Sequence, residues 1–107
     1  MEGGNAVRAI RVRGFRIDII DVDGNADALK KAVDGALDEI RLKDGGLMVC
    51  DREALPKDKP YNEIASLVCG TGIYGDALII GAVDVGSCFY KYADAPQAFE
   101  VLLNFSK

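Results

Sequence analysis

A glycine-rich hexapeptide is the stretch of this chain whose residue types and spacing could do chemistry. Gly70, Gly72 and Gly75 fit the G-x-G-x-x-G spacing with which dinucleotide-binding proteins hold a pyrophosphate. That chemistry needs a helix directly after the loop, because the N–H groups of the helix N-terminus face the phosphates. Residues 76–83 form an apolar run that predicts a buried strand instead. The motif therefore has the spacing of a nucleotide site without the helix that such a site requires.

Two interpretations remain for residues 70–75, which we call the 70–75 loop. In the first, the glycines supply the positive φ angles of a turn before a core strand. In the second, exposed N–H groups of the loop form a pocket for a small anion without a Rossmann fold. The residues assigned to this ligand site are Gly70, Gly72, Tyr74, Gly75 and Asn62. For Asn62 the sequence favours a structural role, because asparagine side chains in such loops more often bond backbone groups.

The composition excludes several familiar catalytic sites. The chain has no histidine, so it contains no Ser/His or Cys/His nucleophile pair and no imidazole metal ligand. Cys50, Cys69 and Cys88 each have apolar neighbours, and we expect buried, reduced thiols. The best carboxylate pairs are Asp21 with Asp23 and Asp38 with Glu39, but one pair lacks the further oxygen ligands that a hard cation needs. We therefore predict no catalytic residues, no metal site and no cofactor.

Charge and hydropathy limit the partners. Thirteen basic and seventeen acidic residues give a formal net charge of −4, which argues against nucleic acid, because backbone binding depends on cationic patches. No apolar run approaches the roughly 18 residues that could span a bilayer, and the N-terminus has no signal-peptide pattern. We expect a cytoplasmic protein that does not bind membranes.

The hydrophobic pattern predicts a single α+β domain over residues 1–107. Alternating residues predict two strands joined by a turn at Arg13 and Gly14, with a bulge or the end of one-sided exposure at Ile19 and Ile20. The remaining predicted elements are a helix at 26–34, strands at 37–42, 47–50, 78–83 and 87–92, and a helix at 95–104 capped by Asp94. Residues 60–65 fit either a short helical turn or an extended link. The order ββαββ then ββα indicates a largely antiparallel sheet with two helices that cover one face.

Short matches along most of the chain carry a resemblance to a known family. The matching stretches are residues 23–35, 39–40, 47–53, 55–56, 62, 73–76 and 78–81, which include Cys50-Asp51-Arg52-Glu53 and Gly75-Asp76. This pattern resembles the small proteins grouped as domain of unknown function 3846, which occur in bacteria, in phages and on mobile elements. The resemblance implies an α+β fold and a phage or mobile-element setting, and it implies no catalytic residues. Residues 85–90 depart from the family pattern.

These observations predict a small, acidic, non-enzymatic interaction protein that binds a host protein or a second copy of itself. Its size, its acidic balance, its missing catalytic residues and the family setting favour this function. A homodimer that joins exposed strand edges fits so small a sheet protein. The alternative is a small-molecule or nucleotide-binding domain that uses the 70–75 loop.

Overall fold

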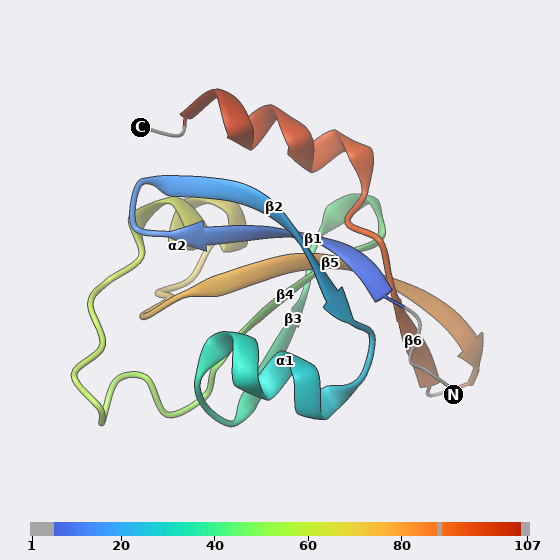
Figure 1. Cartoon of the computed structure of the whole chain (residues 1–107), viewed down its shortest axis with the longest axis horizontal. Coiled ribbons are helices and arrows are strands. Elements are labelled where there is room, and N and C mark those ends of the chain that lie inside the picture. The colour runs from blue at the N-terminus through green and yellow to red at the C-terminus, as the bar shows by residue number, and fades with distance from the viewer. Residues whose placement is uncertain (1–5, 88, 106–107) are drawn as a thin grey trace.

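An antiparallel sheet with helices on both faces forms the described part of the chain (Figure 1). The structure is a computed structural model and describes residues 6–87 and 89–105. The strands are β1 (Ala6–Arg13), β2 (Arg16–Asp23), β3 (Leu37–Arg41), β4 (Gly46–Asp51), β5 (Ala77–Gly86) and β6 (Phe89–Ala93). The helices are α1 (Ala26–Val33), α2 (Glu63–Cys69) and two 3₁₀ segments, η1 (Lys43–Gly45) and η2 (Gln97–Phe105). The predicted α+β fold with its antiparallel sheet is confirmed.

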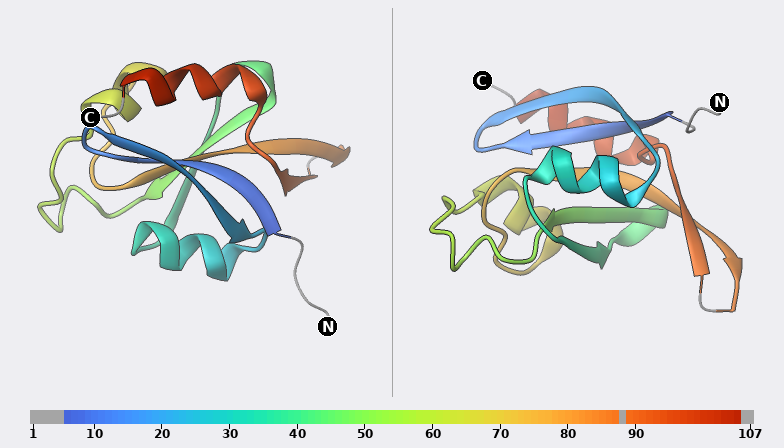
Figure 2. Two further views of the ribbon diagram at one scale, coloured as in Figure 1. Left: turned by 45° about the horizontal axis from the view of Figure 1, so that its top comes forward. Right: turned by 60° about the horizontal axis from the view of Figure 1, so that its bottom comes forward.

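Strand β5 lies at the centre of the sheet and changes partners along its length. The strands follow the order β2-β1-β5-β4-β3, and β6 also pairs with β5. Ile79 pairs with Ile10 of β1 and with Met48 of β4, whereas from Gly81 onward β5 pairs with β6. Figure 2 shows the β5–β6 hairpin extending past the other strands. The predicted strand at 78–83 is confirmed and is longer at both ends.

The β1–β2 hairpin forms through a two-residue turn at Gly14 and Phe15. Arg13 pairs with Arg16, and Gly14 has a φ of 59°, which the first central position of a type II′ turn requires. The turn lies one residue further along the chain than predicted. The predicted bulge at Ile19 and Ile20 is wrong, because the pairing continues without a shift to the end of both strands. The alternative prediction was that β2 stops exposing only one of its faces at this point, and it is confirmed. Ile17 packs into the core on one face of the sheet, and Ile20 packs against the core on the other face.

Helices cover both faces of the sheet, and the expectation that they cover one face is wrong. Leu29 and Val33 of α1 pack against one face. Residues of α2 and η2, including Ala65 and Leu102, pack against the other. Every residue of β4 is buried, as is typical of a strand whose two faces are both covered. Its uninterrupted apolar run, 47–50, is the sequence signal for this arrangement.

Helix α1 matches its prediction closely. The Asn25 side chain accepts a hydrogen bond from the Ala28 N–H at 2.9 Å and caps the N-terminus. The last residue of the helix is Val33, one residue before the predicted end, and Asp34 follows it in the left-handed conformation with a φ of 56°. The described helices include none long and apolar enough to cross a membrane.

Helix α2 and the C-terminal segment η2 differ from the predictions. Residues 63–69 form α2, so the helical interpretation of 60–65 is the closer one, although the helix extends further. The C-terminal helix begins at Gln97, because the Asp94 carboxylate accepts a hydrogen bond from the Arg8 N–H at 2.8 Å instead of capping the helix. The Ala95 N–H in turn donates to the Arg8 carbonyl at 2.8 Å. These two bonds anchor the start of η2 on β1.

Gly81 is the residue where β5 changes partners, and it has no room for a side chain. A Cβ there would lie 2.3 Å from the Asp94 carbonyl oxygen. We expect Gly81→Ala to lower the free energy of unfolding by about 1–3 kcal/mol, because backbone would have to move. Urea unfolding followed by circular dichroism measures this change.

Gly86→Ala is the matched control, because it lies in the same strand. Among the described residues, and apart from its chain neighbours, the atom nearest to its Cβ would be in the Phe89 ring, 3.9 Å away. Equal loss of stability in the two variants would contradict the close-approach explanation.

Candidate functional site

The 70–75 loop connects α2 to β5, and its glycines turn the chain. Gly70 ends α2 with a φ of 81°, and Gly75 has a φ of 78°. Strand β5 begins at Ala77, where a dinucleotide site would need a helix. The loop therefore offers no helix N-terminus on which a pyrophosphate could lie.

Several N–H groups of the loop are hydrogen-bonded within the chain. The Gly70 N–H donates to the Ser66 carbonyl at 2.8 Å, and the Gly75 N–H donates to the Pro60 carbonyl at 2.7 Å. The Ile73 N–H donates to the Ser66 hydroxyl at 2.8 Å. A small-anion pocket needs such N–H groups to point outward. These donors are already occupied, which reduces what the loop could offer an anion.

Asn62 is 2% exposed and joins three parts of the chain. Its side-chain oxygen accepts a hydrogen bond from the Ala65 N–H at 3.1 Å and caps α2. Its amide nitrogen donates to the carbonyl of Val12 at 2.9 Å and to that of Gly75 at 2.8 Å. Asn62 therefore makes the backbone bonds that the sequence favoured over ligand binding.

The other residues assigned to the ligand site lie close by. Tyr74 forms an isolated β-bridge with Tyr61, and the two rings meet edge to face with centroids 5.3 Å apart. Gly72 lies against the same ring, since a Cβ there would be 3.5 Å from Tyr74. Gly75 and Lys59 line a cavity of 160 Å³. The structure thus joins Asn62 to Gly75 and Gly72 to Tyr74, whereas Gly70 lies at the opposite end of α2 from Asn62. The ligand assignment of the five residues stays a prediction.

A buried carboxylate fixes the proline-bearing loop that precedes α2. The Asp51 side chain is 0% exposed, and its Oδ2 lies 2.8 Å from the Lys57 Nζ and 2.9 Å from the Lys59 Nζ. The Glu53 N–H donates to Oδ1 at 2.9 Å. Lys59 Nζ also donates to the Val33 carbonyl at 3.0 Å, at the C-terminal end of α1. One carboxylate and two ammonium groups thus connect β4, the loop and α1.

The environment of Asp51 favours its ionised form. Burial alone would raise its pKa, but the hydrogen bonds from Lys57, Lys59 and the Glu53 N–H outweigh burial and hold the pKa well below the usual range. The carboxylate therefore stays charged and bonded, which makes it a poor general acid or base at neutral pH.

A second polar cluster holds the β5–β6 hairpin against β3. The hydroxyls of Tyr90 and Tyr92 donate to the two carboxylate oxygens of Glu39. The Arg41 guanidinium lies 4.6 Å from the Tyr90 ring centroid and 2.7 Å from an Asp84 oxygen. The bond to Glu39, together with burial, raises the pKa of Tyr90 to about 12. Tyr90 is therefore a hydrogen-bond donor rather than a nucleophile at neutral pH.

The described thiols are not activated as nucleophiles. Cys50 is buried and unpaired, and burial followed by the nearby Asp38 raises its pKa to about 11. Burial also raises the pKa of Cys69, and Cys88 lies outside the described residues. Within residues 6–87 and 89–105, no group of three cysteine, aspartate or glutamate side chains could hold a metal ion.

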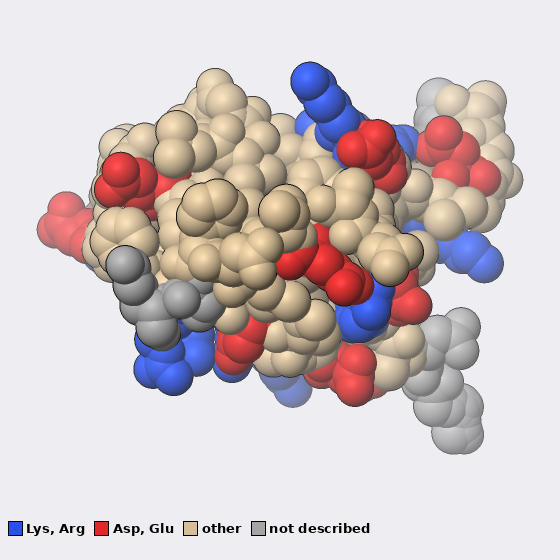
Figure 3. Space-filling view, turned by 90° about the horizontal axis from the view of Figure 1, so that it is seen from above, with Lys and Arg blue, Asp and Glu red and all other residues tan. Residues whose placement is uncertain are grey.

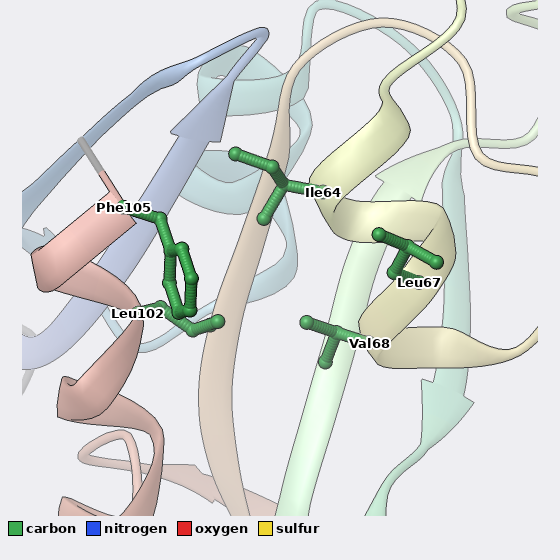
Figure 4. Close-up of a pocket in the computed structure, with 5 residues that line it drawn as sticks. All are labelled: Ile64, Leu67, Val68, Leu102 and Phe105. Atoms are coloured by element: carbon green, nitrogen blue, oxygen red, sulfur yellow. The ribbon is translucent and has the colours of Figure 1, made fainter. Parts of the chain in front are cut away.

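The most distinctive surface feature is an apolar groove between α2 and η2, which we call the α2–η2 groove. Figure 4 shows Ile64, Leu67 and Val68 of α2 facing Leu102 and Phe105 of η2. These five side chains line a cavity of 270 Å³. The exposed fraction is 78% for Leu67 and 59% for Phe105. Figure 3 shows a wide uncharged area on the face that carries η2.

The groove continues toward a polar end. A neighbouring cavity of 340 Å³ shares Val68 with the groove and is also lined by Phe99, Lys43 and Asp44. Lys43 belongs to η1, and Phe99 lies one turn of η2 before Leu102. The groove thus runs from Ile64 and Phe105 at one end to Phe99 and Lys43 at the other.

The sequence predictions missed the α2 side of this groove because they gave a helical turn only as one alternative for residues 60–65 and did not extend it to Cys69. A signal was present: Asn62 and Gly70 fit the two ends of a helix, and Ile64, Leu67 and Val68 have the three-and-four spacing of one helix face. On the η2 side, Val101 is 57% exposed and Leu102 is buried.

The chain is a small α+β domain in which Glu39, Asp51 and Asn62 bond other groups of the chain. Residues 7–100 match the family described as Domain of unknown function (DUF3846). The chain belongs to this family, as its sequence resemblance predicted.

Among solved structures, the chain is similar to the one titled crystal structure of small RNA methyltransferase HEN1. The TM-score is 0.72 at 14% sequence identity, over 96% of this chain and 16% of that chain. At this identity the likeness shows a shared fold alone, and our chain spans about one sixth of the other protein's chain. A search of curated proteins found no significant match.

We expect Asp51→Asn to destabilise the protein by about 1–3 kcal/mol, because it weakens hydrogen bonds between charged groups at a buried site. The effect depends on pH in a defined direction. The pKa of Asp51 is lowered in the folded state, so its contribution is fully present above the unfolded value of 3.8 and is lost as the pH falls below it. Urea unfolding between pH 7 and the acid range, about pH 2.5, measures this dependence.

The exposed Asp23→Asn variant provides the control, because it removes the same charge from the surface. If Asp51→Asn and wild type lost stability in parallel as the pH fell below 4, Asp51 would not be the group responsible.

Proposed function

We propose that this chain is a non-enzymatic interaction module that binds a partner protein through the α2–η2 groove. The observation that carries the proposal is the groove itself, lined by Ile64, Leu67, Val68, Leu102 and Phe105 without a polar side chain. Exposed apolar surface of this kind marks interaction sites in soluble proteins. A large apolar side chain of a partner would fill the cavity and cover Leu67 and Phe105.

The dimensions of the groove favour a protein side chain over a small-molecule ligand. Its 270 Å³ lies just below the roughly 300–1,000 Å³ of typical ligand clefts. Such clefts also contain a few polar groups that orient the ligand, and the lining of the 270 Å³ cavity has none, because the charged side chains line the neighbouring cavity. Aromatic and aliphatic anchors that enter apolar pockets are the usual centres of protein interfaces.

The class of partner follows from the family setting. We propose that this chain acts in the phage or mobile-element setting of its family, with a host protein or a second copy of itself as partner. The proposed compartment is the cytoplasm, where thiols such as those of Cys50 and Cys69 stay reduced.

The test is partner capture with two matched substitutions. Leu67→Lys places a charge at the rim of the groove and keeps the helix, because Lys at this position can pair with Glu63 four residues earlier. Leu55→Lys makes the same change at a leucine that is 61% exposed outside the groove. We expect wild type and Leu55→Lys to retain the same protein from bacterial lysate, and Leu67→Lys to lose at least about nine tenths of it.

Capture has to be quantified at equal folding, so the melting temperatures of all three proteins are measured first. A partner that Leu67→Lys retains as well as wild type does would contradict the proposed groove. So would a monomeric protein that captures nothing.

A further inference from the structure

The charges at the two ends of the α2–η2 groove narrow the choice of partner. Glu63 is the first residue of α2 and lies one turn before Leu67 on the same side of the helix. Lys43 lines the cavity at the opposite end, beside Val68 and Cys69. Both side chains belong to exposed residues, and within the described part of the chain neither forms an ion pair. The groove therefore has an unpaired acid at one end and an unpaired base at the other.

We infer that the α2–η2 groove binds a second copy of this chain, related by a twofold axis that lies in the interface and crosses the groove. This inference rests on the proposed function and names its partner. Such an axis reverses the direction of the groove in the second copy, so Glu63 of each copy faces Lys43 of the other. An axis along the groove would instead place like charges opposite each other, which is unfavourable.

The apolar residues fit the same arrangement. A twofold interface uses one patch on both copies, so the patch must supply both the cavity and the side chains that fill it. Here the cavity of 270 Å³ lies directly beside Leu67 and Phe105, which are 78% and 59% exposed. Val101, which is also in η2, is 57% exposed.

The surface area that a stable dimer would bury is a small part of the accessible surface of this chain. A standard interface buries about 800 Å² on each partner. The accessible surface of this chain is 6190 Å², so the dimer would cover about one eighth of it. The face that carries the groove in Figure 3 has a wide uncharged area, and no described ion pair crosses the cavity between α2 and η2.

Asp44 and Arg41 also line the cavity at the basic end. Arg41 is already paired with Asp84 at 2.7 Å. Asp44 follows Lys43 directly and has a φ of 61°. A carboxylate next to Lys43 weakens the attraction to Glu63, so the apolar contact has to supply most of the affinity.

Sedimentation equilibrium of the full chain tests the inference with a charge-reversal cycle. We expect wild type and Leu55→Lys to be dimers, and Leu67→Lys to raise the dimer dissociation constant at least about tenfold. Lys43→Glu and Glu63→Lys should each raise it about fivefold, because each change places two pairs of like charges across the interface. The double variant Lys43→Glu/Glu63→Lys should return it to within about twofold of wild type, since each charge again meets its opposite.

Melting temperatures measured for every variant separate a folding defect from a loss of association. Failure of the double variant to restore the dimer would overturn the arrangement, because only a pairing between copies predicts rescue. A wild-type protein that stays monomeric up to about 1 mM would also overturn it.

The two proposals fail in distinguishable ways. If the protein is monomeric but captures a different protein in a manner that Leu67→Lys abolishes, the second-copy inference is wrong and the proposed function stands. If it forms a dimer that Leu67→Lys leaves intact, the groove is not the dimer interface and the second-copy inference is wrong. The proposed function is then wrong as well only if Leu67→Lys also captures every partner protein as well as wild type does.

Discussion

Asn62 holds three segments of backbone together from a single buried side chain. It caps α2 through Ala65, and it donates to the carbonyl of Val12 on β1 and to that of Gly75 in the 70–75 loop. A buried carbonyl that lost this donor would lack a hydrogen bond, which is costly in the interior. The short helix α2 has seven residues and could not persist without such anchoring. The α2–η2 groove therefore owes its shape to a residue that does not line it.

The elements predicted well from sequence are those whose pattern is local. Strand β5 follows from the apolar run at 78–80, the β1–β2 turn follows from Gly14, and α1 follows from an asparagine cap and a spaced apolar face. Helix α2 was not predicted as a full element because seven residues are fewer than the window that reveals a helical period. The coverage of both sheet faces was missed for a different reason. The two predicted helices, at 26–34 and 95–104, pack against opposite faces, and no local pattern reports the face on which a helix packs.

The candidate site residues also separate into those whose arrangement the local sequence predicts and those whose contacts depend on the tertiary fold. The mismatch between the glycine motif and the strand after it is visible in sequence, because both lie within 17 residues, from 70 to 86. Glu39 meets Tyr90 across 51 positions of the chain and Asn62 meets Val12 across 50, and no local pattern reports such pairs. The Asp51 cluster spans only six to eight positions, but its formation depends on how the proline-bearing loop folds back. The local sequence identifies candidate residues, but only the tertiary fold determines whether their side chains bond one another or a ligand.

Because β5 changes partners along its length, its two halves should differ in their protection from amide hydrogen exchange. Up to Gly81 its backbone has neighbours on both sides, and beyond that residue β6 is its paired neighbour among the described strands. Val83, Val85 and Phe89 are 46%, 58% and 71% exposed, so little burial opposes local opening of the outer hairpin. We expect amide hydrogens near Ile79 to exchange with solvent through global unfolding, and those near Val85 to exchange through local opening of the β5–β6 hairpin. Exchange rates should therefore rise steeply over a few residues of a single continuous strand.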